Sequence, residues 1–160
     1  MTPEILKWLF QITYECGKMN LEGFSEVEIT ADPQPSGNNA AWILSHILAE
    51  RDTVLELLGG GKVMTEAERK PFLHFQISTA KALLPSKARL FEIWDESQAR
   101  ISAALDKQTP ETLDEVVPAV MEGGKPDSRG RKIVFFHFHE SYHIGQLGLL
   151  RRLLGKEGAI

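Results

Sequence analysis

The stretch HESYHIGQLGLLRRLLG, residues 139–155, carries the clearest structural signal in the chain. Its apolar side chains recur at spacings of three and four, the period of one helix face: Ile144, Leu147, Leu150 and Leu154. His139 and His143 are four residues apart, so they project from nearly the same side of that helix. The pattern predicts one long helix from about Arg131 to Leu154, with both histidines turned toward the core.

Three further long helices are expected upstream, because the same period recurs there. They span Pro3 to about Gly23, near Ser36 to Leu58, and Ser86 to just before Thr109. The inward face of the first is expected to consist of Ile5, Leu6, Leu9, Ile12, Cys16 and Met19. The seam of the third is expected to consist of Leu90, Trp94, Ser97, Ile101 and Leu105.

Four long helices with scarcely a strand predict an all-α fold, a four-helix bundle formed by a single domain of residues 1–160. Short links make neighbouring helices antiparallel, but the link between the second and third helices, residues 59–85, is long enough to cross the bundle. A long crossover leaves those two helices parallel, so the expected topology is up-down-down-up.

The residue composition of the shorter connections also predicts local structure. Residues 26–30, EVEIT, have the β-branched composition of an extended piece. Pro110 is placed to start one or two helical turns that end by Pro118. Residues 122–130, EGGKPDSRG, have the composition of a loop.

Composition excludes several classes of partner. The chain has 160 residues, 42% hydrophobic and 25% charged, with a formal net charge of -4, so neither nucleic acid nor an anionic membrane is an expected partner. No apolar run approaches the ~20 residues that span a bilayer. The beginning MTPEILKWLF does not resemble a signal peptide, which predicts a cytoplasmic protein. The single cysteine, Cys16, is expected to be a buried inert thiol.

His46 is the best candidate to join the histidine pair. It lies in the middle of the second helix, on an inward arc with Ile43, Glu50, Val54 and Leu57. From there it can meet His139 and His143 across the bundle centre. Three imidazoles leave one position of a tetrahedral metal ion open, as in sites that bind or activate a small molecule. The alternative is a set of interior histidines satisfied by ordinary hydrogen bonds.

Several other residues are candidates for a role in the site or its pocket. Glu50 is a candidate catalytic residue, fourth ligand or acceptor that orients an imidazole, or simply a solvated residue. Glu140 is a candidate general base. His137 should face away from the pair, and His74 lies in the long connection, at a pocket mouth or in water. Further pocket candidates are Trp42, Trp94, Tyr142 and Gln146.

Residues 139–143 also match H-E-x-x-H, the pattern of zinc peptidases, in which the glutamate is the general base. A peptidase needs a third ligand downstream, and in the extended pattern Gln146 and Leu149 occupy the positions of the glycine and last histidine. The chain also lacks a run of strands on which a peptide could align. A metallopeptidase is therefore a disfavoured alternative.

The segment NNAAWILSHILAERD, residues 38–52, together with the ending HESYHIGQLGLLRRLLG, resembles the DinB-like superfamily of bacterial four-helix bundles, which includes YfiT-like metalloenzymes. The resemblance covers nearly the whole chain. It implies a divalent metal ion, zinc or nickel, held by His46, His139 and His143, and often a homodimer. In many members a glutamate follows the first motif histidine without a peptidase role, so the resemblance weakens Glu140 as a base.

The resemblance also implies a class of activity. Some relatives bind a low-molecular-weight thiol at the open metal position and transfer it to a small-molecule substrate. The expected function is therefore a metal-dependent enzyme, either a thiol S-transferase or a hydrolase. The alternative from another class is a non-catalytic bundle with a role in binding or in stress-related association.

Overall fold

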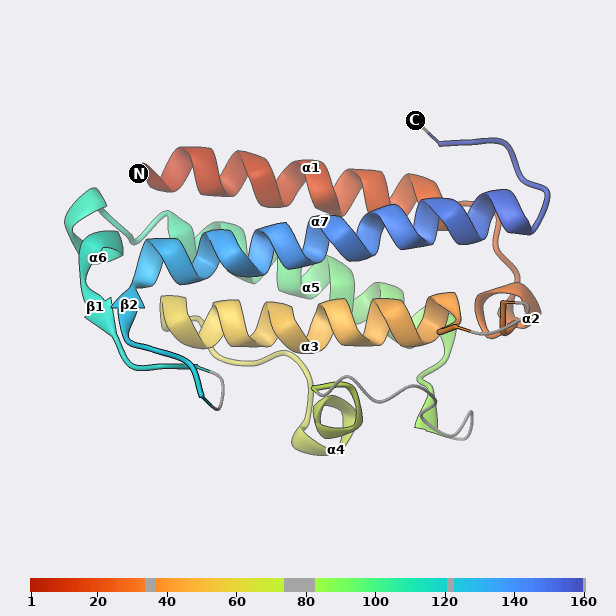
Figure 1. The fold of residues 1–160 in the computed structure, drawn as a ribbon, viewed down its shortest axis with the longest axis horizontal. Coiled ribbons are helices and arrows are strands. Elements are labelled where there is room, and N and C mark those ends of the chain that lie inside the picture. Colours follow the sequence, from red (N-terminus) through yellow and green to blue (C-terminus); the bar gives the residue numbers. More distant parts are fainter. Residues whose placement is uncertain (34–36, 74–82, 121–122, 160) are drawn as a thin grey trace.

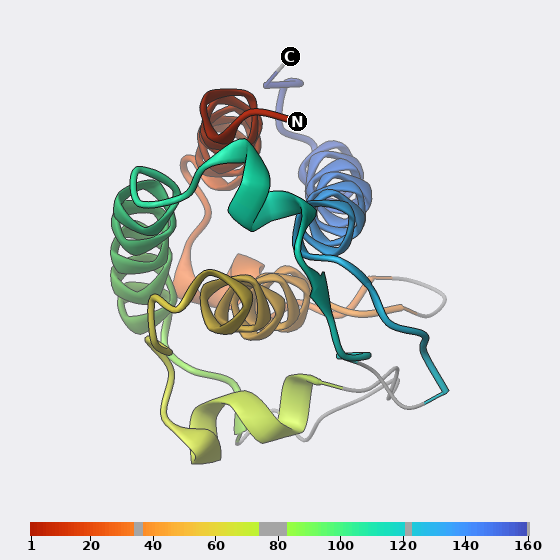
Figure 2. The same cartoon turned by 90° about the vertical axis from the view of Figure 1, so that its left-hand side faces the viewer.

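The computed structural model describes residues 1–33, 37–73, 83–120 and 123–159. Within them the long helices are α1 (Pro3–Leu21), α3 (Ala40–Leu58), α5 (Lys87–Leu105) and α7 (Arg129–Leu153). Figure 1 shows α1 and α7 running in one direction and α3 and α5 in the other. Figure 2 shows these helices nearly end-on, with α1 packed beside α5 and α7, and α3 completing the bundle. The predicted all-α four-helix bundle with up-down-down-up topology is confirmed.

Side-chain caps explain where the long helices begin. The side-chain oxygen of Asn39 accepts the backbone N–H of Trp42 at 2.9 Å, and that of Ser86 accepts the N–H of Arg89 at 3.2 Å. Each bond satisfies a backbone donor that has no partner within the first turn of its helix. α3 ends at Gly59, whose φ of 72° is a left-handed conformation that glycine adopts without strain. The cap at Ser86 and the end at Gly59 agree with the prediction, whereas α3 begins at Ala40, a few residues later than the predicted start near Ser36.

The prediction of an extended piece at residues 26–30 is wrong, because α2 (Glu26–Ile29) is helical. Ser25 and Glu28 form a capping box: the hydroxyl of Ser25 accepts the N–H of Glu28, and the Glu28 carboxylate accepts the N–H of Ser25. This reciprocal pair stabilises a helical turn more than the β-branched side chains favour a strand.

The other connections contain short regular elements. α4 (Glu66–Arg69) and the 3-10 helix η1 (Lys70–Phe72) lie in the crossover, and α6 (Pro110–Asp114) follows α5 as predicted. β1 (Val116–Val117) pairs antiparallel with β2 (Asp127–Ser128). The segment predicted as a loop therefore contains a short strand, whose pairing partner lies about ten residues away and is invisible to local composition.

The described part of the crossover packs along α3, on the side of that helix where Figure 1 shows α4. The buried carboxylate of Asp52 accepts the backbone N–H groups of Val63 and Met64 at 2.8 and 3.0 Å. Arg69 donates to the carbonyl of Ala49 at 3.1 Å and to the hydroxyl of Thr53 at 2.7 Å. Because it is covered in this way, α3 is buried on nearly all sides.

The inward face of α1 differs from the prediction. Ile5 and Met19 are 52% and 37% exposed, whereas the buried residues are Pro3, Leu6, Phe10, Thr13, Gly17, Asn20 and Leu21. Small and polar residues are required there, because a Cβ at position 17 would lie 2.3 Å from Cη2 of Trp94 and 2.7 Å from Cδ1 of Ile144. Hydrophobicity alone therefore misplaces the face by selecting the larger apolar side chains.

We predict that Gly17→Ala lowers the free energy of unfolding by about 1–3 kcal/mol, because the added methyl group overpacks the core against Trp94. Gly145→Ala is the matched control, since a Cβ at that helical glycine meets no atom within 4 Å. It should be neutral or stabilising by up to about 1 kcal/mol. Urea unfolding followed by circular dichroism measures both variants, and equal effects would contradict the close approach at Gly17.

Candidate metal centre

The structure brings together three histidines from two antiparallel helices, His46 on α3 and His139 and His143 on α7. Nε2 of His139 lies 3.4 Å from Nε2 of His46 and 3.1 Å from Nε2 of His143. All three ligand atoms lie within 4.8 Å of one another. Two nitrogens bound to one tetrahedral zinc ion at about 2.05 Å are about 3.3 Å apart, so the spacing suits a single ion.

The other ring nitrogens of two of these histidines are held by hydrogen bonds. Nδ1 of His46 donates to the carbonyl oxygen of Phe72 at 2.5 Å, and Nδ1 of His143 donates to Oε1 of Gln146 at 2.8 Å. In a neutral imidazole, a hydrogen on Nδ1 leaves a lone pair on Nε2. Both lone pairs are therefore available on the side where the three rings meet, as metal-binding histidines require.

Burial keeps the three imidazoles neutral at physiological pH. It is the largest cause that lowers the pKa of each ring, and a nearby imidazole lowers the pKa of His139 and His143 further. For His139 the pKa falls to about 4. The hydrogen bonds to Phe72 and Gln146 oppose the shift at His46 and His143. Neutral rings are the form that binds a metal ion.

Aromatic side chains surround the histidines. Trp42, which is buried, stacks on His46 with ring centroids 5.3 Å apart. Phe135 stacks on His139 at 6.4 Å, and Tyr142 contacts His143 edge-on at 5.2 Å. Phe135 and Tyr142 are 47% and 59% exposed, so one side of the histidine cluster borders the surface.

Glu140 takes no part in the histidine cluster. Its carboxylate is 4% exposed and accepts two hydrogen bonds from Arg51, from Nε at 2.9 Å and from the terminal nitrogen Nη2 at 2.7 Å. The hydroxyl of Thr13 donates a third bond at 2.5 Å. A carboxylate held by three donors is poorly placed to act as a base, so the structure gives the expected catalytic role of Glu140 no geometric support.

The remaining candidates occupy separate positions. The Glu50 carboxylate accepts from Thr53 at 3.2 Å and is not among the clustered groups of the described residues. Nε2 of His137 donates to the carbonyl of Leu9 at 3.1 Å, so its ring faces α1, and it is not part of the histidine cluster, in agreement with the expectation that it faces away from the pair. Trp94 packs between Tyr14 and Phe91 in the core, and His74 lies outside the described residues.

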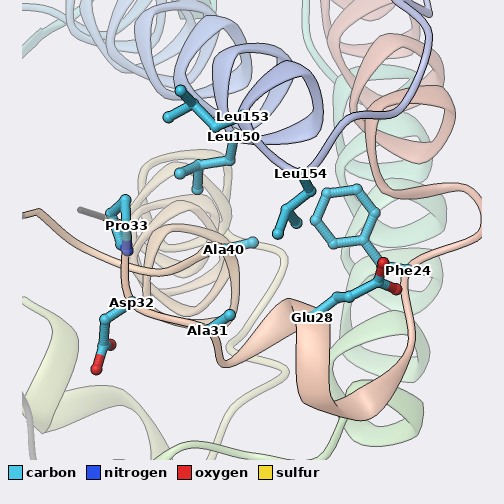
Figure 3. Close-up of a pocket in the computed structure, with 9 residues that line it drawn as sticks. All are labelled: Phe24, Glu28, Ala31, Asp32, Pro33, Ala40, Leu150, Leu153 and Leu154. Carbon is cyan, nitrogen blue, oxygen red and sulfur yellow. The ribbon is translucent and has the colours of Figure 1, made fainter.

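A small apolar pocket opens near the start of α3 and the end of α7 (Figure 3). Its volume is about 270 Å³, and Glu28 and Asp32 are the acidic residues among those that line it. Leu150, which lines it, is seven residues beyond His143 on α7, or about 10 Å along the helix. The pocket is therefore distinct from the histidine cluster.

The fold and the site together define a class of protein: a four-helix bundle in which three histidines from two helices converge. The chain belongs to the DinB superfamily, whose family model matches residues 19–147. No curated protein matches the chain.

Among the helices that the structure describes, none is long and apolar enough to cross a membrane.

Two solved structures show the same fold. A conserved protein from Enterococcus faecalis has a TM-score of 0.73 and 20% sequence identity, over 98% of this chain and 99% of its own. YfiT from Bacillus subtilis, described as a probable metal-dependent hydrolase with an unusual four-helix bundle topology, has a TM-score of 0.70 and 12% identity. That match covers 97% of this chain and 89% of YfiT.

We predict that the metal-free protein loses stability as the pH falls from about 6.5 to about 4. In the unfolded chain His139 takes up a proton near its ordinary pKa of 6.5, but in the folded chain it does so only near 4. The unfolded state therefore binds more protons across this window, and the free energy of unfolding decreases. Urea unfolding at several pH values should show a smaller loss for His139→Gln. Equal losses in the two proteins would contradict the shifted pKa.

Proposed function

We propose that the protein binds one divalent metal ion through Nε2 of His46, His139 and His143 and is a metal-dependent enzyme. The observation that supports this proposal is the convergence of three Nε2 atoms, two of which carry a lone pair because their rings hold the hydrogen on Nδ1. A hydrogen on Nε2 of His139 can satisfy only one of these two lone pairs, whereas a cation can bind all three nitrogens of neutral rings. The description of YfiT as a probable metal-dependent hydrolase agrees with this class of function.

A divalent ion at this position would lower the pKa of a bound water or thiol and so supply a nucleophile at neutral pH. The protein's own residues prepare the site for that chemistry. Phe72 and Gln146 fix the hydrogen of two imidazoles on Nδ1, and Trp42 shields His46 from water. We propose hydrolysis or transfer of a low-molecular-weight thiol as the reaction, zinc or nickel as the metal, and the cytoplasm as its location.

The alternatives have less support. A zinc peptidase would need the glutamate of H-E-x-x-H free to act on a metal-bound water, but Arg51 and Thr13 hold that carboxylate. In the described residues the strands are only two residues long, which is too short to align a peptide. A non-catalytic bundle would also bind the metal, so turnover of a substrate is what separates it from an enzyme.

We predict that protein purified without an affinity tag binds one divalent ion per chain and that His46→Ala lowers its affinity for zinc at least tenfold. A tetrahedral ion that loses one of three protein ligands is held only by the two remaining imidazoles. The control is His137→Ala, because His137 faces α1. Titration against a chelating dye measures both variants. Unchanged zinc affinity in His46→Ala would contradict the three-histidine site.

A second measurement separates thiol from water at the open position. We predict that 2-mercaptoethanol or bacillithiol added to the cobalt-loaded protein produces a thiolate-to-cobalt charge-transfer band, because a bound thiol is deprotonated by the ion. The cobalt-loaded His46→Ala variant is the control for thiol that binds cobalt elsewhere. A spectrum that does not change on addition of either thiol would leave hydrolysis as the supported reaction.

We also propose that the protein forms a homodimer through the outer face of α7. This face carries an apolar stripe in which every residue is at least 47% exposed: Phe135, Phe138, Tyr142, Leu149 and Leu153. Their spacings of three, four, seven and four residues match the seam of two packed helices. A second copy is the partner that fits, since a stripe of this kind can pack against itself about a two-fold axis.

We predict a dimer by sedimentation velocity for the wild-type protein and a monomer for Leu149→Glu, because the change buries a charge in the seam. Val27→Glu is the control: Val27 is 78% exposed on α2, outside the stripe. That variant should remain dimeric. A monomeric wild-type protein at micromolar concentration would overturn the proposal.

A further inference from the structure

The buried ion pair between Arg51 and Glu140 lies on the same two helices as the histidine cluster. Arg51 is five residues beyond His46 on α3, and Glu140 directly follows His139 on α7. The side chains of the pair are 1% and 4% exposed. The guanidinium binds both carboxylate oxygens, Nε to Oε2 at 2.9 Å and Nη2 to Oε1 at 2.7 Å. The pair therefore links the two ligand-bearing helices next to the site.

Neutral groups from the other two long helices complete this network. On α5, Gln98 and Ser97 accept from the terminal nitrogen Nη1 of Arg51 at 3.1 and 3.3 Å. On α1, the hydroxyl of Thr13 donates to Oε1 of Glu140 at 2.5 Å. All four long helices thus contact one buried pair of charges, and each charge has partners beyond the other.

The two-point contact restricts how α3 can slide along α7. A slip of one residue moves a helix by about 1.5 Å along its axis, which would separate at least one of the paired atoms beyond hydrogen-bonding distance. The same slip would displace His46 from His139, whose Nε2 atoms are 3.4 Å apart. A planar guanidinium that binds a carboxylate through two parallel hydrogen bonds has one preferred geometry, so the pair specifies a register.

We propose that Arg51 and Glu140 are positioning residues of the metal centre: their ion pair sets the register of α3 against α7 in which the three imidazole nitrogens converge. The inference rests on the proposed function, because it concerns the affinity of that same metal site. It assigns the glutamate of H-E-x-x-H a partner in the protein core and a role in placing the ligands on either side of it.

Two variants test the proposal. Arg51→Lys keeps the positive charge but cannot form the two-point contact. The double variant Arg51→Met with Glu140→Leu removes both charges and fills similar space, which often leaves the stability of a buried pair nearly unchanged. Thr13 and Ser97 keep an acceptor for their hydroxyl hydrogens in this variant, since the Thr13 hydroxyl lies 3.2 Å from the carbonyl oxygen of Phe10 and Ser97 donates to that of Trp94 at 2.9 Å.

The control is Lys18→Met with Asp95→Leu, an ion pair whose side chains are 28% and 55% exposed. This pair, 2.5 Å apart, connects α1 to α5, neither of which carries a histidine of the cluster. The control removes one positive and one negative charge from an interhelical contact. An effect of losing an ion pair between helices that does not depend on burial will appear in it as well.

Zinc affinity, the cobalt absorption spectrum and thermal unfolding are measured for each folded protein. We expect Arg51→Lys and the double variant to bind zinc about 10–100-fold more weakly and to show an altered cobalt ligand-field spectrum. The control should match the wild type in both. A purely structural ion pair would lower only the unfolding temperature, because the affinity of the folded fraction would not change.

The outcomes separate this inference from the proposed function. A wild-type protein that binds no divalent ion would overturn both. A wild-type protein that binds zinc, together with a folded Arg51→Lys variant of equal zinc affinity and identical cobalt spectrum, would overturn the positioning role alone. If the double variant does not fold, Arg51→Lys decides the result.

Discussion

The arrangement of the bundle depends on two opposite charges buried at its centre, those of Arg51 and Glu140. Removing ions of this kind from water costs several kcal/mol each, so a buried pair is tolerated only where geometry and further hydrogen bonds compensate for that cost. Here the compensation comes from every long helix, through Thr13 on α1 and the polar pair Ser97 and Gln98 on α5. The charges therefore constrain all four helices together.

The topology and the candidate metal site are connected by the crossover. Because α3 and α5 are parallel, the chain must travel the length of the bundle between them, and part of that path packs along α3. Asp52 and Arg69 hold this part in place, and η1 brings the carbonyl of Phe72 to Nδ1 of His46. A short turn between antiparallel helices could not supply this acceptor. The long connection thus covers α3 and also orients one of the candidate ligands.

Local sequence signals predicted the long helices well but predicted the inward face of α1 poorly. Helix ends depend on caps such as Ser86 and on glycines such as Gly59, which act within a few residues and can be recognised in the sequence. The face that α1 buries depends on what lies opposite. Gly17 is buried because Trp94 occupies the space where its side chain would be, and Thr13 because Glu140 requires a donor. Neither partner is near in sequence.

The sequence by itself determined the helical bundle, its topology and the three histidines as a candidate set, because periodicity, capping and connection length are local properties of the chain. Tertiary structure alone decided what the glutamate of H-E-x-x-H does. The motif is compatible with a base on a metal-bound water, and only the position of Arg51, 89 residues earlier, places that carboxylate in an ion pair. Long-range contacts decide such roles, since a carboxylate's chemistry follows from the groups that surround it.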